Sequence, residues 1–415
     1  MFLPDGEASL SAMDTLTNNP NATLLLGKLS PDELAALASI SDETAVLTAY
    51  VDFTEGGQHR AEASARKSLR ALRDHEPDGE APRNWEDTLA PVEERLLAAM
   101  GAERHAGERA RAVFVSFGGT GAVIVHAPEP IANLTVVARQ AYLRPLMAAD
   151  ATSSVTGMIS ITHQGMTISE FWGSHQRAEW SVPVPETAEG RRLVGPSRSR
   201  LTAGRRASVQ GDLAARRQDV HFGSFIDDAV GELVNQARRR GWRSVIVGGD
   251  VRDSGRAAAA LREAGIDALI HPRHIESASE RQAALAVVRQ ERVEREIAWV
   301  GELADAAGAN NVPGGTAAAV EAIEAGRAGQ VLIGAPAPQS VTASPKSPLL
   351  NLDDIGEDDP LERVVRAALL NMTPLHTVSG KAAKALPASG VATQLRAPAA
   401  RDNRGTPANL LRPAP

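Results

Sequence analysis

The sequence predicts an α/β protein built from three α/β domains. Segments with helical periodicity and segments with strand periodicity alternate along most of the 415 residues. At about 150 residues per domain, this length allows two to four domains. Hydrophobic residues make up 43% of the chain, which is enough for several cores. We expect an N-terminal domain over 1–152, a central domain over 153–285, a C-terminal domain over 286–397 and a disordered, proline-rich tail over 398–415.

The N-terminal domain is predicted to carry a helix that starts at Pro31, because proline suits the first helical position and Asp32 suits the first turn. Residues 118–121 are rich in glycine and lie between two apolar runs, which indicates a hairpin. The other expected elements are strands over 45–53, 111–117, 122–126 and 134–138 and helices over 60–74 and 91–100.

In the central domain, two apolar runs over 155–163 and 166–171 turn at Gln164-Gly165, which predicts two antiparallel strands. A strongly amphipathic helix is expected over 222–240, with Gly241 ending it. Antiparallel strands come first and helices alternate with strands afterwards, which is the element order of an RNase H-like domain. The other expected elements are strands over 177–184, 244–247 and 268–270 and a helix over 255–264.

A long helix over 277–307 is expected where the central and C-terminal domains meet. Helices and strands alternate after it, and such alternation is typical of a mostly parallel sheet covered on both faces. The segment 336–360 is rich in proline, serine and aspartate, which indicates an exposed loop. The expected helices cover 316–325 and 361–370, and the expected strands cover 331–333, 376–378 and 392–396.

Positive charge is concentrated in one segment of a chain whose net charge is −7. Eight arginines and one acidic residue, Asp212, fall between Arg191 and Arg217. We expect a loop over 187–220, since hydrophobic periodicity starts only at its end. Guanidinium groups bind phosphate bidentately and the segment has no aromatic residues for base stacking, which favours contact with an RNA backbone. The candidate RNA-binding residues are Arg198, Arg200, Arg205, Arg206, Gln210, Gly211, Arg216 and Arg217; the alternative interpretation is a disordered, solvated loop.

Residue content excludes several kinds of chemistry. The chain has no Cys, which excludes disulfides, thiolate nucleophiles, iron–sulfur clusters and the usual structural zinc sites. It has no Walker A pattern, no complete Gly-x-Gly-x-x-Gly and no Gly-x-Ser-x-Gly elbow. We therefore predict no catalytic residue, no metal and no cofactor. The first residues lack a secretory signal and no apolar run is long enough to span a membrane, so we expect a cytoplasmic protein without a membrane partner.

Three further features have a plain structural interpretation beside a functional one. The turn Gly248-Gly249-Asp250 follows a buried strand, so it is either a ligand-binding turn or simply a tight turn. His271 and His274 have a spacing that suits a metal site on a helix, but the proline between them favours exposed loop histidines. An acidic run matches no calcium loop and is expected to be solvated. It consists of Asp353, Asp354, Glu357, Asp358 and Asp359.

Several stretches occur in the order found in a known family. The first, 45–52, reads Ala-Val-Leu-Thr-Ala-Tyr-Val-Asp. The second, 205–250, contains the basic segment, the amphipathic helix and Ser-Val-Ile-Val-Gly-Gly. The third, 314–334, starts with Gly-Gly-Thr and ends with Gln-Val-Leu-Ile-Gly, and 389–396 closes the series. Over roughly 45–396 the chain resembles the bacterial branch of the archaeo-eukaryotic peptide-chain release factors, relatives of Pelota and of the hibernation factor Balon.

The resemblance implies an RNase H-like central domain and a Pelota-type α/β/α sandwich at the C-terminal end. It also implies a translation factor whose partners are the ribosome, ribosomal RNA or tRNA, and it admits an elongation-factor GTPase as a further partner. In the true release factors, a Gly-Gly-Gln loop of the central domain positions water for ester hydrolysis. Here Gly56-Gly57-Gln58 lies in the first domain, and the implied loop over 204–211 has Gln210 and Gly211 without a Gly-Gly pair.

We therefore expect ribosome rescue, release or hibernation without Gly-Gly-Gln catalysis, with the arginine-rich segment in contact with RNA. Two alternatives stay open. The first is a peptidyl-tRNA hydrolase that acts on the ribosome, for which Gln210 is the water-positioning residue that the resemblance offers. The second is a small-molecule α/β enzyme that uses the turn at Gly248-Gly249-Asp250.

Overall fold

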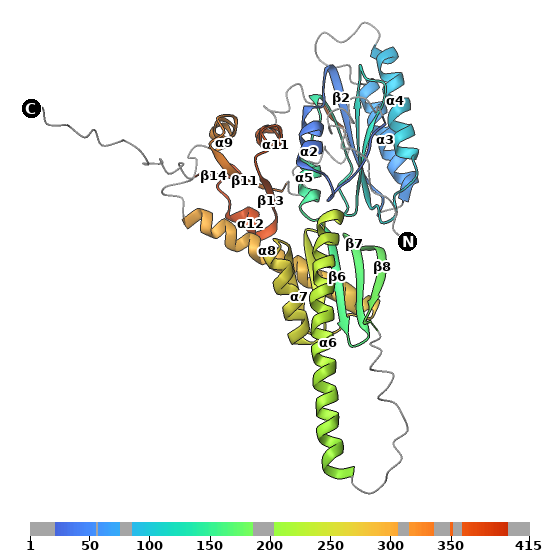
Figure 1. Ribbon diagram of the computed structural model, residues 1–415. Coiled ribbons are helices and arrows are strands. Elements are labelled where there is room, and N and C mark those ends of the chain that lie inside the picture. Colours follow the sequence, from blue (N-terminus) through green and yellow to red (C-terminus); the bar gives the residue numbers. More distant parts are fainter. Residues whose placement is uncertain are drawn as a thin grey trace, which may run out of the picture.

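The structure is a computed structural model that describes residues 21–54, 57–74, 85–185, 203–305, 315–335, 349–351 and 359–396. Within these residues the strands form three sheets, each covered by helices (Figure 1). The protein is therefore a mixed α/β protein, as the sequence predicts. The predicted tail over 398–415 lies outside the described residues. No helix in the described ranges is long and apolar enough to cross a membrane.

The first sheet has six strands in the order β1-β4-β3-β2-β5-β12. The long strand β2 lies inside the sheet and pairs antiparallel with β3 and β5, and the predicted hairpin at 118–121 joins β3 to β4. Parallel pairs, β1 with β4 and β12 with β5, form the two edges. The strands are β1 (Thr23–Leu25), β2 (Ser41–Asp52), β3 (Ala110–Ser116), β4 (Val123–Ala127), β5 (Leu134–Gln140) and β12 (Leu349–Asn351).

Helices cover both faces of the first sheet, and the alternation of side chains along β2 explains why both faces are apolar. Val46 and Tyr50 point to one face, whereas Leu47 and Val51 point to the other. The first face is covered by α2 (Pro31–Ser39) and α5 (Arg144–Asp150), and the second by α3 (Gly57–Asp74) and α4 (Trp85–Gly101). Helix α2 begins where the sequence predicts, with Ser30 forming a capping box that stabilises it by about 1 kcal/mol.

The second sheet has the order β10-β9-β6-β7-β8, with β6 at its centre. β6, β7 and β8 are consecutive antiparallel strands, whereas β9 runs parallel to β6 and β10 parallel to β9. This is the element order that the sequence predicts for the central domain. The strands are β6 (Val155–Thr162), β7 (Gly165–Trp172), β8 (His175–Pro183), β9 (Ser244–Gly248) and β10 (Asp267–His271). Helices α6 (Ala203–Arg240) and α7 (Val251–Glu263) cover one face, and the start of α8 (Ala278–Asp305) covers the other.

The loop predicted over 187–220 is wrong for residues 203–220, which form the first half of helix α6. Residues 203–220 are rich in alanine, arginine and glutamine, which have high helix propensity. Each residue added to an existing helix also forms one more hydrogen bond, so the packed half supports its continuation. The prediction relied on hydrophobic periodicity, which these mostly polar turns do not have.

The third sheet has the order β13-β11-β14. β11 (Ala328–Gly334) is parallel to β13 (Leu375–Val378) and antiparallel to β14 (Val391–Leu395), so the predicted, mostly parallel sheet is in fact mixed. The difference arises at α12 (Gly380–Ala385), because the chain passes over the opposite face there and returns along the other edge of β11. α9 (Gly315–Glu324) and α11 (Pro360–Leu370) cover one face and α8 and α12 the other, which gives an α/β/α sandwich.

One strand crosses the domain boundaries that the sequence predicts. Residues 349–351, expected in an exposed loop over 336–360, form β12 and pair with β5 of the first sheet. The cores also merge, because Leu37 of α2 and Leu146 of α5 share one apolar cluster with Val365 of α11. The N-terminal and C-terminal parts of the chain therefore pack as one unit.

Candidate nucleic-acid interface

The two halves of α6 have different surroundings. In the second half, the side chains of Ile226, Val230, Leu233 and Ala237 follow one another at helical spacing and are buried against the central sheet. Gly241 ends the helix with φ 67, a left-handed conformation that glycine adopts without strain. The sheet therefore fixes the direction in which the whole helix points.

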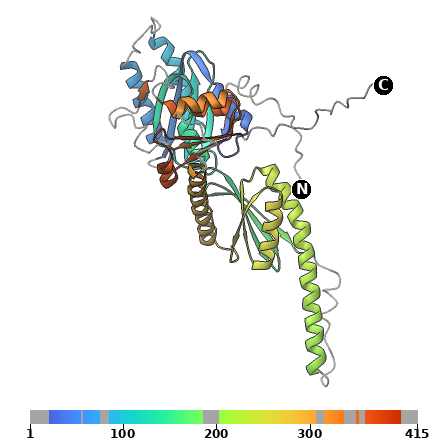
Figure 2. The ribbon, with the colours of Figure 1, turned by 90° about the vertical axis from the view of Figure 1, so that its left-hand side faces the viewer.

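The first half of α6, residues 203–221, extends past the end of the central sheet (Figure 1). Figure 2, a view turned by 90°, shows the same extension. A helix rises about 1.5 Å per residue, so the stretch from Arg205 to Arg217 is about 18 Å long. The structure thus places a basic stretch of helix away from the body of the protein.

Six of the eight predicted RNA-binding residues lie in this half of α6. At about 100° per residue, the helix brings the positions of Arg206, Gln210 and Arg217 within about 40° of one another. The positions of Arg205 and Arg216 lie within about 20° of each other on the neighbouring stripe. The remaining members behave differently: Gly211 lies elsewhere on the same helix half, and Arg198 and Arg200 lie outside the described residues.

The basic residue at the other end of α6 has a structural partner instead. Arg240 lies 3.2 Å from the buried carboxylate of Glu170. The indole of Trp242 donates to the same carboxylate at 2.9 Å, and Lys28 and Arg177 lie 3.9 and 3.8 Å from it. Four side chains therefore neutralise or hydrogen-bond this one buried acid, and one of them, Lys28, comes from the N-terminal part of the chain.

Where the structure describes the two places that the sequence suggests for a Gly-Gly-Gln loop, the residues are helical. Residues 204–211, where the resemblance implies such a loop, are helical. Gln58 lies in the first turn of α3, on the N-terminal sheet and not on the central one, while Gly56 lies outside the described residues. Gln210 is therefore a position inside a long helix rather than at the tip of a loop.

The turn Gly248-Gly249-Asp250 is a packed turn. A side chain at Gly248 would lie 2.7 Å from the backbone oxygen of Arg273, and one at Gly249 would lie 2.8 Å from that of Ile161. Gly249 also has φ 146, and Asp250 uses its carboxylate to cap the N-terminus of α7. The residues at this turn are therefore all used to connect β9 to α7.

The histidine and acidic candidates are dispersed. His274 is exposed in the loop after β10, and His271 lies at the end of that strand within 3.1 Å of the backbone oxygen of Arg273. Of the acidic run, Asp359 caps α11, and Asp353, Asp354, Glu357 and Asp358 lie outside the described residues. Across the part of the chain that the structure describes, no three His, Asp or Glu side chains gather as a metal site would require.

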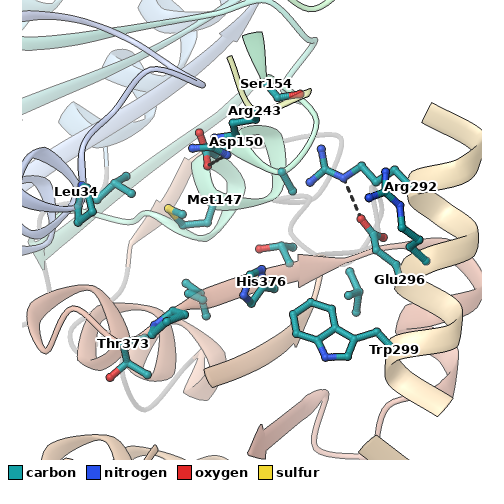
Figure 3. A pocket seen from close by; sticks show the side chains of 18 of the residues that line it. Leu34, Met147, Asp150, Ser154, Arg243, Arg292, Glu296, Trp299, Thr373 and His376 are labelled. Carbon is teal, nitrogen blue, oxygen red and sulfur yellow. Dashed lines mark hydrogen bonds and ion pairs between the residues drawn. The ribbon is translucent and has the colours of Figure 1, made fainter. Parts of the chain in front are cut away.

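Sequence reasoning missed a second group of charged residues. Arg243, Arg292 and His376 come from three distant parts of the chain and line a cavity between the domains (Figure 3). None of them lies in a local motif, since the distances between them along the chain exceed any motif spacing. The only local hint is the pairing of Arg292 with Glu296 one helical turn later.

The three sheets and the projecting basic helix define a multi-domain α/β protein with a candidate nucleic-acid interface. No protein-family model matches the sequence, and a search of curated proteins finds no match. Among solved structures, the chain is similar to the archaeal translation termination factor aRF1, with 16% identity, a TM-score of 0.24, and coverage of 90% of this chain and 99% of that one.

Two further solved structures are similar to the chain. One is a model of ribosome-bound archaeal Pelota and ABCE1, with 13% identity, a TM-score of 0.35, and coverage of 88% of this chain and 94% of that one. The other is S. cerevisiae Dom34, described as a translation termination-like factor that interacts with Hbs1. It has 9% identity, a TM-score of 0.37, and coverage of 70% of this chain and 75% of that one.

Proposed function

We propose that the protein is a ribosome-associated translation factor that contacts ribosomal RNA or tRNA through the first half of α6. The observation that carries the proposal is the position of Arg205, Arg206, Arg216 and Arg217 on a helix that runs past its sheet. Arginine on a projecting helix can reach phosphates on a large, curved RNA surface without moving the folded domain. The ordered motifs shared with peptide-chain release factors support the same function.

The proposal includes the finer features that the resemblance implies. These are membership of the bacterial branch, a cytoplasmic location, an elongation-factor GTPase as a second partner and a role in rescue, release or hibernation. It does not include hydrolysis, because Gln210 is a helical position and Gln58 lies on the N-terminal sheet. The protein would act by occupying the ribosome.

Co-sedimentation with ribosomes across a salt series tests the proposal. If about four arginines neutralise phosphates, the slope of log affinity against log salt is roughly −3, taking ~0.7 per contact. Affinity should then fall roughly 50-fold between about 50 and about 200 mM salt. An affinity that does not change with salt would contradict an electrostatic contact.

Double variants test whether the contact with RNA is made by the first half of α6. Arg205→Gln with Arg206→Gln should make the slope shallower by about 1.4, because two contacts are lost. The matched control is Arg239→Gln with Arg252→Gln, which removes the same charge from exposed positions at the packed end of α6 and on α7. Equal loss in both double variants would mean that net charge, and not the first half of α6, determines binding.

A further inference from the structure

A cavity of about 790 Å³ lies where the three sheets meet (Figure 3). Its walls come from α2 and α5 of the N-terminal sheet, from the start of β9, from α8 and from β13. This volume falls within the range of about 300–1,000 Å³ that is usual for small-molecule sites. Sites between domains are also common places for ligands.

Part of the cavity lining is apolar and adaptable. Leu34, Met147, Leu369 and Met372 line it, and methionine side chains fit ligands of irregular shape. Met372 has φ 50, which is uncommon for a residue other than glycine, and the residue is 61% exposed. Met372 therefore places an apolar side chain at the edge of the cavity although its backbone has a conformation that suits glycine better.

Charged side chains also line the cavity, three arginines and three acidic residues: Arg243, Arg292, Arg295, Asp150, Asp267 and Glu296. His376 lies near the middle of the view in Figure 3, with Arg243 above it and Arg292 above it to the right. The imidazole packs edge-on against the indole of Trp299, with 4.5 Å between the ring centres. Burial is the main cause that lowers the pKa of His376, and the charges of Arg292 and Arg243 lower it further. The positive charges of the two guanidinium groups therefore favour the neutral form of the imidazole.

Within the described residues, Arg243, Arg292 and Arg295 each pair with one acidic side chain. Arg243 lies 3.2 Å from Asp150, whose other oxygen accepts the backbone N–H of Gly27 at 3.0 Å. Arg292 lies 3.1 Å from Glu296 on the same helix. A guanidinium has five N–H donors, so one such contact orients it and leaves donors for a ligand.

We propose that this cavity binds a nucleotide-sized organic phosphate, with its phosphate between Arg243 and Arg292 beside His376 and its flat, apolar part against Met147 and Met372. Arginine forks match phosphate oxygens, and the neutral imidazole can donate one further hydrogen bond. Because the walls belong to all three sheets, the bound ligand holds the domains in one relative arrangement. This site is independent of the α6 surface and of the proposed function.

Calorimetric titration of the full chain with ADP, pyrophosphate and adenosine tests the site. ADP should bind, adenosine should bind at least about tenfold more weakly because it lacks the phosphates, and pyrophosphate should compete with ADP. Arg292→Gln should weaken ADP at least about tenfold. The matched control is Arg289→Gln on the same helix, whose side chain pairs with Glu129 and does not line the cavity.

A second readout separates this site from binding to the α6 arginines. Proton NMR of His376 should show its pKa rising when pyrophosphate is added, because an anion nearby favours the imidazolium. The charged groups that line the cavity with His376 are Arg292, Arg295 and Glu296 from α8, Asp150 from α5, Asp267 from β10, and Arg243. The paired substitution Arg205→Gln with Arg206→Gln should leave both the ADP affinity and this shift unchanged.

Any one of three results would overturn the proposal. The first is that the protein does not bind ADP, and the second is that Arg292→Gln and Arg289→Gln lose the same affinity for ADP. The third is that the NMR signal of His376 does not respond to pyrophosphate. If Arg292→Gln proves unstable, His376→Gln serves in its place, since His376 is exposed on β13 and forms no ion pair with the residues that the structure describes. His376→Gln should also weaken the binding of ADP. An unchanged affinity for ADP in a folded His376→Gln protein would contradict the proposed site.

Discussion

The carboxylate of Glu362 accepts the backbone N–H of Arg144 at 2.8 Å, which joins α11 to the start of α5. Its other oxygen accepts the N–H of Leu143 at 2.8 Å. Leu143 is the N-cap of α5 and has no side chain that could satisfy these donors, so a carboxylate distant in sequence caps the helix. Nearby, Asp359 pairs with the Arg144 guanidinium at 2.8 Å and accepts the hydroxyl of Tyr142 at 2.7 Å.

The first prediction concerns the pH dependence of stability. Burial raises the pKa of Glu362 to about 8, although the two backbone N–H donors and Arg366 act in the opposite direction. A carboxyl with a raised folded-state pKa stabilises the fold below its unfolded value, near 4.5, and that contribution is lost as the pH rises through about 8. Denaturant unfolding between about pH 6 and about pH 9 should show a fall of at most about 1.4 kcal/mol per pH unit.

Glu362→Gln tests which group causes that fall. The glutamine side chain cannot ionise, so stability should depend less on pH in this range. Its amide nitrogen cannot accept an N–H, so the variant should also lose about 1–3 kcal/mol at low pH. An unchanged pH slope in the variant would assign the dependence to other groups.

A second prediction uses the close approach of Gly157 to Trp242. A side chain at Gly157 would lie 2.3 Å from the indole ring, so the backbone of β6 needs glycine here. Gly157→Ala should therefore destabilise the protein by about 1–3 kcal/mol. Gly231→Ala in the middle of α6 is the opposite control: nothing lies within 4 Å, and alanine should stabilise the helix by about 0.5–1 kcal/mol. Two changes of the same sign in thermal unfolding would contradict this account.

A third prediction concerns a buried ion pair in the N-terminal sheet. Arg111 is fully buried, lies 2.7 Å from Glu108, and donates to the backbone oxygen of Ala99 near the end of α4. Arg111→Met removes the guanidinium from Glu108, which keeps only His126 and the backbone N–H of His105, and from that carbonyl, so it should cost about 3–5 kcal/mol in urea unfolding. The exposed Arg327 is the comparison, because its pair with Glu321 is solvated and Arg327→Met should cost less than about 1 kcal/mol.

A fourth prediction separates RNA contact from folding. Arg205→Glu, Arg206→Glu, Arg216→Glu and Arg217→Glu together should abolish ribosome association and leave the melting temperature nearly unchanged, because a stretch of sequence without apolar periodicity has little to bury and solvated charges contribute only about 0–1 kcal/mol each. Ile246→Asp, in the middle of buried β9, should instead unfold the central domain. A large drop in melting temperature for the arginine variant would make these arginines structural ion-pair partners.

The fifth prediction concerns catalysis. The purified protein should release no peptide from peptidyl-tRNA on ribosomes above background, and neither Gln58→Ala nor Gln210→Ala should change this. The structural reason is that both residues lie in helices, Gln58 in α3 on the first sheet and Gln210 in α6 of the central domain. Release that Gln210→Ala abolishes would support the peptidyl-tRNA hydrolase alternative, and release that Gln58→Ala abolishes would move the active centre to α3.

The fold could be predicted wherever an element buries an apolar stripe. The hairpin of β6 and β7, the packed half of α6 and strand β9 all have the expected periodicity, and each lies within a few residues of its predicted range. Elements without a stripe were missed. The first half of α6 is mostly polar, and β1 and β12 have three residues each, which is too few to carry a period.

The candidate sites differ in how far the sequence could predict them. The arginine cluster is contiguous, so it is visible in the sequence, although its helical form is not. The cavity depends on Met147, Arg243 and His376, which come together only because the three sheets pack against one another. Tertiary packing of this kind leaves no local pattern in a single sequence.

Strand β12 affects the order in which the protein can mature during synthesis. The N-terminal sheet is otherwise made from residues before 141, but its last edge strand is synthesised only at 349–351. While the ribosome makes the intervening chain, the outer edge of β5 has unpaired N–H and C=O groups and can pair with a neighbouring chain. A chain whose synthesis stops before residue 349 therefore leaves the outer edge of β5 unpaired. Such a chain is prone to aggregation even though every other strand of that sheet is present.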